Sequence, residues 1–165
     1  MHSHFKQNKK WHNGFGLIEI IITAGLISLV LSAFIQVASV SLKLLLNEKY
    51  TLEASYLLEE GAEGLRAIRD NGWTANVVPL ANGTTYYLVS TSTYALVTTA
   101  PSYINARYLR TVVLASVNRD ANDRIASSGT LDAGTRKATI TVSWSNRSAT
   151  TSVQSILYLT NFEQN

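Results

Sequence analysis

The sequence predicts an α+β fold, in which one long N-terminal helix packs with its second half on a C-terminal antiparallel β-sheet. Residues 20–42 contain no acidic or basic side chain, and this run reaches the roughly 20 residues that a helix needs to cross a bilayer. The first proline is Pro79, so nothing compels the helix to break before the stop signal at residues 70–72. From Trp73 onward the chain is rich in Thr, Ser, Val and Tyr, which favour strands.

These features divide the chain into four segments. We expect a basic leader at residues 1–14, the membrane-spanning half of the helix at 15–42, its extramembrane half at 43–72 and a β head domain at 73–165. In the leader a small residue, Gly14, precedes the apolar run, whereas a secretory signal carries its apolar region before the cleavage site. Cleavage after Gly14 would therefore leave the membrane helix on the mature chain. The leader's lysines favour a cytoplasmic N-terminus and an external head.

Charge and residue usage argue against several classes of function. Lys6, Lys9 and Lys10 equal the whole formal excess of +3, so the chain from Phe15 onward is formally neutral and lacks the electrostatic footprint of nucleic-acid binding. Cysteine is absent, and the three histidines lie in the leader. The rest of the chain therefore lacks the thiol nucleophile, the commonest general base and the usual zinc ligands. We expect neither an enzyme nor a cofactor.

Glu19 stands at the leading edge of the apolar run, where an ionisable group is expensive and marks a function or a partner. A carboxylate in a low-dielectric layer either takes up a proton or finds a cation. A freed α-amine on Phe15, of the same chain or of a neighbouring copy, is the nearest candidate cation. The sequence therefore predicts that Glu19 pairs with another charged group.

Residues 14–22, GFGLIEIII, follow a short basic leader and closely resemble the processing site of type IV prepilins and type II secretion pseudopilins. The resemblance implies a pilin-like fold, cleavage between Gly14 and Phe15 by a membrane-embedded prepilin peptidase, and N-methylation of Phe15. It also implies that Glu19 meets the N-terminal amine of a neighbouring subunit during assembly. The implied partners are the peptidase, other pilin or pseudopilin subunits, the lipid bilayer and the membrane platform of the assembly machine. From the residues alone, the alternative is an uncleaved single-pass anchor with a stray glutamate.

A second, weaker similarity covers the outer helix and the end of the chain. Residues 57–70, LLEEGAEGLRAIRD, resemble the post-membrane helix of minor pilins and pseudopilins of the PilV or GspI type, and residues 139–144 and 158–161 look similar too. Many major pilins carry a proline where this chain has Gln36, and often a C-terminal disulfide that it lacks. The resemblance therefore implies a minor subunit of a pilus or secretion pseudopilus in a prokaryotic cell. The alternative function is a filament-tip or membrane-anchored binding module, either an adhesin or a receptor for a substrate or DNA.

The outer helix has one stripe at alternating spacings of four and three that we expect to pack on the head. The stripe consists of Ala54, Leu58, Gly61, Leu65 and Ile68. Glu59, Glu60 and Glu63 fall largely elsewhere, as either a solvated face or a docking face for another subunit.

The head is expected to be an antiparallel sheet with one face covered by the helix. Asn82-Gly83 predicts a hairpin between strands at 77–81 and 84–92. A short strand at 94–98 and a loop at 99–106 come next, and three longer strands occupy 108–118, 137–145 and 149–159. On 108–118, Leu109, Val113, Ala115 and Val117 share one side, although Val112 and Leu114 on the other side suggest that both faces are partly covered. On 137–145 one face carries Ala138, Ile140, Val142 and Trp144, and on 149–159 the residues expected to face inward are Val153, Leu157 and Leu159.

Two groups of head residues have an alternative interpretation as binding sites. Asp120, Asn122 and Asp123 supply the oxygen ligands that calcium prefers, although turns are rich in Asp and Asn for local reasons. Tyrosines on the predicted strands and loop would form an adhesive aromatic surface if they were exposed, and would be ordinary sheet residues if they were buried. These tyrosines are Tyr86, Tyr87, Tyr94, Tyr103 and Tyr108.

Overall fold

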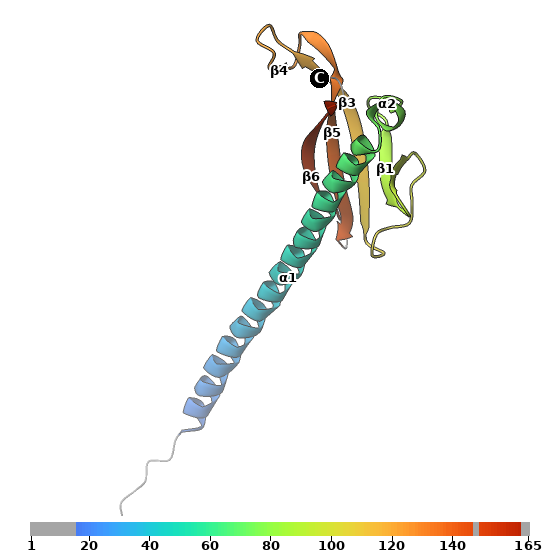
Figure 1. Ribbon diagram of the computed structural model, residues 1–165. Coiled ribbons are helices and arrows are strands. Elements are labelled where there is room, and N and C mark those ends of the chain that lie inside the picture. The colour runs from blue at the N-terminus through green and yellow to red at the C-terminus, as the bar shows by residue number, and fades with distance from the viewer. Residues whose placement is uncertain (1–15, 147–148, 163–165) are drawn as a thin grey trace, which may run out of the picture. The chain divides into compact units, whose positions relative to one another are not determined.

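The protein was analysed as a computed structural model that describes residues 16–146 and 149–162. The chain divides into two compact units, Met1–Asn47 and Glu48–Asn165. One helix, α1 (Leu17–Asp70), supplies the described residues of the first unit and the opening segment of the second. The described chain therefore has the predicted α+β arrangement of a long N-terminal helix and a C-terminal antiparallel sheet (Figure 1).

The second unit contains a six-stranded antiparallel sheet. Its strands run in the order β2-β1-β3-β5-β6, and β4 pairs with the end of β3. The elements after α1 are α2 (Trp73–Asn76), β1 (Thr85–Ser90), β2 (Tyr94–Val97), β3 (Tyr108–Arg119), β4 (Ile125–Ala126), β5 (Thr130–Asn146) and β6 (Ala149–Thr160).

The helix stripe predicted from the sequence packs on the sheet. Ala54, Gly61, Leu65 and Ile68 are buried, and Leu58 is half-buried against both core clusters of the head. The larger cluster joins the helix to four strands, through residues such as Leu88 of β1, Val112 of β3, Ile140 of β5 and Leu159 of β6. Gly61 and Gly64 lie on this buried face, where a Cβ at Gly64 would collide with side chains of the sheet and a Cβ at Gly61 would fit tightly.

The hairpin predicted around Asn82-Gly83 is wrong. Residues 73–76 form the short helix α2, and the Val77 N–H donates to the Trp73 carbonyl at 2.9 Å. Trp73 and Val77 are four residues apart, so one helical turn puts both side chains into the core, where they are 4% and 1% exposed. Gly83 adopts a left-handed φ of 74° and leads into β1, and the hairpin is instead β1–β2 across residues 91–93.

The two C-terminal strands follow their predicted patterns. Ala138, Ile140, Val142 and Trp144 of β5 are buried, as alternation predicted. On β6, Leu159 is buried and Val153 and Leu157 are half-buried. These assignments were reliable because a clean period of two fixes which residues share a face.

On β3 both faces are partly covered as far as Leu114, as the sequence suggested, because Leu109 and Val113 are half-buried on the face opposite the buried one. The buried side chains are Tyr108, Arg110, Val112 and Leu114, whereas Ala115 is exposed. A register shift between Ser116 and Val117 reverses the alternation, so that Val117 becomes buried. The fully buried face contains two residues with polar groups, Tyr108 and Arg110, which the sequence analysis did not place in the core.

Candidate functional site

The first half of α1 is an extended exposed apolar surface on the described chain. Its side chains are exposed throughout, for example Leu17 at 77% and Phe34 at 72%. An 18-residue window of this helix has a mean hydropathy of 2.4, and by length and composition the helix can cross a membrane. Soluble proteins rarely leave an apolar patch of this extent uncovered, and such patches mark sites of interaction with protein or membrane.

The hydroxyl groups along this helix satisfy their hydrogen bonds within it. Thr23, Ser28, Ser32 and Ser39 each donate to the backbone carbonyl four residues earlier, at 2.7–2.8 Å. A hydroxyl bonded in this way brings little polar surface to the outside of the helix. These four residues therefore leave the apolar surface effectively continuous.

Glu19 lies in the first turn of α1, and its backbone N–H donates to the Gly16 carbonyl at 2.9 Å. A carboxylate in the first turn interacts favourably with the positive end of the helix dipole. Within residues 16–146 and 149–162, no basic side chain lies within ion-pair distance of it. The carboxylate is thus presented on an apolar surface with its charge uncompensated by a side chain of the described chain. Gly14 and Phe15, the residues predicted for processing, lie outside the described residues.

The calcium site considered at residues 120–123 is not assembled. The Asp120 carboxylate accepts hydrogen bonds from the backbone N–H groups of Asn122 at 2.8 Å and Arg124 at 2.9 Å, as in an ordinary Asx turn. Asp123 lies 3.6 Å from the Arg119 guanidinium. Among the described residues, no group of three His, Cys, Asp or Glu side chains is placed to hold a metal ion.

The five tyrosines do not form an adhesive surface either. Tyr86 and Tyr108 are buried, and Tyr87 and Tyr94 are half-buried. Only Tyr103 among the five is exposed, at 60%. The alternative interpretation, that these are ordinary sheet residues, is the one that the structure supports.

A buried polar network that the sequence analysis missed joins β3 to α1. The Tyr108 hydroxyl donates to the Glu53 carboxylate at 2.6 Å. Arg110, 4% exposed, donates from Nη1 to the Leu57 carbonyl at 2.9 Å, and the same nitrogen lies 3.3 Å from Glu60. Burial, and then the hydrogen bond to Glu53, raise the pKa of Tyr108 above its usual range. The only signal in the sequence was an arginine at an alternating position of an apolar strand.

Arg119 and Asp132 form a second polar link, at the far end of the head. Arg119 Nε lies 2.6 Å from Asp132 Oδ2, and the Asp132 carboxylate also accepts from the Gly134 N–H at 2.9 Å. The hydrogen bond from Arg119 is the main reason that the pKa of Asp132 lies below its usual range. The pair ties β3 to β5 beyond the register shift, where α1 contributes no buried residue to the core.

Comparison of the chain with protein-family models, with curated proteins and with solved structures finds no match.

Proposed function

We propose that this protein is a minor pilin or pseudopilin, a membrane-inserted structural subunit that is cleaved after Gly14 and N-methylated at Phe15. It assembles through its N-terminal helix into a type IV pilus or a secretion pseudopilus. The observation that carries the proposal is the uncompensated Glu19 carboxylate, which lies within the prepilin-like segment GFGLIEIII at the start of an exposed apolar helix.

The physical argument concerns the cost of an unpaired charge. A carboxylate surrounded by apolar side chains gains much from a nearby cation. If the cation is the new α-amine of a neighbouring copy, only assembled subunits receive this gain. Apolar packing alone discriminates little between lipid and another helix. Glu19 would therefore fix the axial position of one helix against the next, while the apolar surface supplies contact area.

The head would then lie outside the membrane and be carried by the helix. Its sheet and the outer part of α1, joined through Tyr108 and Arg110, belong to one compact unit, Glu48–Asn165. The partners in this proposal are the prepilin peptidase, other subunits, the bilayer and the membrane platform of the machine.

The test compares Glu19→Ala with Glu48→Ala in cells that contain the assembly machine. Both residues are exposed acids on α1, but Glu48 lies beyond the apolar run. We expect mass spectrometry to show that the mature chain begins at Phe15 in both variants. We expect Glu19→Ala to be lost from the sheared filament or pseudopilus fraction and Glu48→Ala to be retained.

Two results would overturn the proposal. Retention of residues 1–14 in the assembled wild-type protein would exclude processing at Gly14. Normal incorporation of Glu19→Ala would exclude the pairing role of the carboxylate.

A further inference from the structure

β6 closes one side of the sheet, and its outer edge lacks the features that normally prevent such edges from pairing. Among the described strands it pairs with β5 alone, in one uninterrupted register from Thr160 opposite Thr135 to Ala149 opposite Asn146. Its 12 residues, ATTSVQSILYLT, include no charged side chain and no proline. Natural edge strands are protected by charge, proline, bulges or short length, and β6 is about twice the usual strand length.

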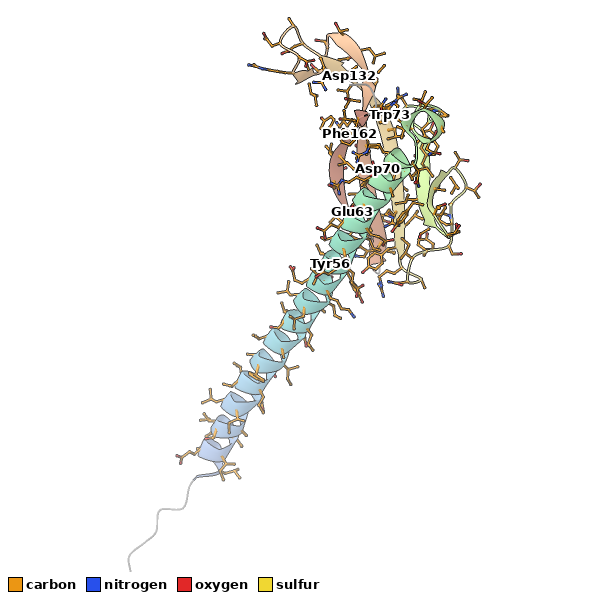
Figure 2. The ribbon with its side chains drawn as sticks, viewed as in Figure 1. Tyr56, Glu63, Asp70, Trp73, Asp132 and Phe162 are labelled. Atoms are coloured by element: carbon orange, nitrogen blue, oxygen red, sulfur yellow. The ribbon has the colours of Figure 1, made fainter. Side chains whose placement is uncertain are left out.

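A groove of about 590 Å³ runs beside this edge, between β6 and α1. From α1 it is lined by Tyr56, Leu58 and Ala62 and, on β6, by Gln154 and Ser155. Tyr56 is 62% exposed although its ring is large and largely apolar; Tyr56 and Glu63 are labelled on α1 in Figure 2. A strand added to β6 would send alternate side chains into this groove.

The groove has an acidic margin. Glu59 and Glu63 of α1 line it together with Arg66. Arg66 already pairs with Glu63, whereas no basic side chain of the described residues lies within ion-pair distance of Glu59. The margin therefore carries one uncompensated negative charge in a groove of mixed polar and apolar lining, and this charge favours a basic side chain that enters beside it.

We propose that the β6 edge and this groove bind an extended strand of another polypeptide by β-augmentation. The added strand hydrogen-bonds to the free side of β6 and directs a basic and an apolar side chain toward α1. Main-chain hydrogen bonds supply the affinity in such complexes, and the side chains that point into pockets supply the specificity. The surface lies within the second unit and does not involve Glu19, so it is independent of the role proposed for the helix.

A second copy of this chain fits the site less well. The opposite edge, β2, lies within residues 91–106, which contain no charged residue, so β2 offers nothing to Glu59. β6 itself is uncharged as well. A basic strand from a different protein is therefore the occupant that the charge favours.

The experiment uses the full chain in detergent and a labelled peptide, acetyl-Thr-Lys-Thr-Val-Thr-Lys-Thr-amide, whose lysines and valine share one face. Two comparison peptides replace both lysines by glutamate or carry N-methyl groups on alternate backbone nitrogens. Fluorescence anisotropy measures the Kd, and hydrogen exchange measures the protection of β6 amides. Glu59→Lys tests the acidic margin, and Glu48→Lys makes the same charge change on α1 outside the groove.

We expect the lysine peptide to bind saturably and to protect amides of β6. Glu59→Lys should weaken binding about fivefold and Glu48→Lys less than about twofold, as the energies of exposed charge pairs suggest. The N-methylated peptide should lose more than about tenfold, because it lacks several main-chain hydrogen bonds.

Other outcomes would overturn the proposal. One is that the lysine peptide shows no saturable binding up to about 1 mM. Another is that the N-methylated or the glutamate peptide binds as tightly as the lysine peptide. A third is that hydrogen exchange shows protection only of amides outside β6. A chain dimer that excludes the peptide and dissociates in Ile156→Lys would assign the edge to a second copy instead.

Discussion

Gly64 offers a direct test of how closely α1 approaches the sheet. A Cβ atom added at this position would lie 2.7 Å from Leu88 Cδ2 and 2.9 Å from Tyr94 Cδ1. Both contacts are shorter than Cβ atoms tolerate. Leu88 is 4% exposed and has little space in which to move, and Tyr94 presents a rigid ring, so its whole side chain would have to shift. Gly64→Ala therefore forces α1 and the sheet apart or displaces both side chains.

The size of the effect follows from two opposing contributions. Replacing a helical glycine by alanine gains about 1 kcal/mol of helix propensity, whereas overpacking a closely packed core costs about 1–3 kcal/mol. The net effect of Gly64→Ala should be a loss of about 1 kcal/mol. For a head of this size we expect the Tm to fall by about 4 °C.

Gly61→Ala is the matched comparison, on the same buried face of the same helix. Its Cβ would lie 3.1 Å from Arg110 Cδ and 3.2 Å from Ile140 Cγ2, so the neighbours need to shift only by a few tenths of an ångström. The propensity gain should roughly offset that cost. Thermal unfolding of the full chain in detergent, followed by near-ultraviolet circular dichroism, measures both variants. Two results would refute the reasoning: a Tm for Gly64→Ala that equals or exceeds that of the wild type, or a Tm for Gly61→Ala that is lower than that of Gly64→Ala.

Three further predictions concern the head. Tyr108 keeps its proton in the folded head above pH about 10, where the unfolded chain releases it, so the free energy of unfolding should fall as the pH rises past about 10. Glu53→Gln should lower the Tyr108 pKa, measured by tyrosinate absorbance, and make that fall smaller; an unchanged titration would contradict the hydrogen bond. Since Arg119 lowers the pKa of Asp132, that carboxylate stabilises the head above pH about 4 and loses its effect as the pH falls toward its folded value. Asp132→Asn should therefore lower the Tm at pH 7 more than at pH 3, and equal decreases at both pH values would count against the ion pair. Millimolar calcium should leave the wild-type Tm unchanged because the 120–123 turn already uses its carboxylates locally; a rise abolished by EDTA would show otherwise.

The sequence predicted the parts of the fold whose signal is periodic and uninterrupted. The stripe from Ala54 to Ile68 and the alternation of β5 each continue over several repeats, so one face is clearly more apolar than the other. Both patterns reflect burial of a single face, and burial is what the structure confirms.

The errors occurred where a contact distant in sequence decided the local structure. Asn82-Gly83 is a strong hairpin signal by itself, but Trp73 and Val77 gain more by entering the core together on one turn of α2. Tyr108 and Arg110 face inward because their polar groups meet acceptors on α1, more than 50 residues earlier in the chain. No local pattern contains that information.

The proposed functional surfaces also differ in whether the sequence alone could identify them. Glu19 could be singled out from the sequence, because one ionisable residue at the edge of an apolar run needs no tertiary information. The β6 edge could not, since an uncharged strand is ordinary until the sheet order places it on the outside.

The internal hydrogen bonds of Thr23, Ser28, Ser32 and Ser39 bear on how readily the helix could pass between lipid and the surface of other helices. Each hydroxyl keeps its bond whether the helix is surrounded by lipid or by other helices, so a transfer between the two breaks none of these four bonds. Lipid tails and helix surfaces are similarly apolar, and the free-energy difference along this part of the helix is correspondingly small. In the proposed role, such a helix can be drawn out of the bilayer and returned to it with little work, and the direction of the exchange is then decided at Glu19.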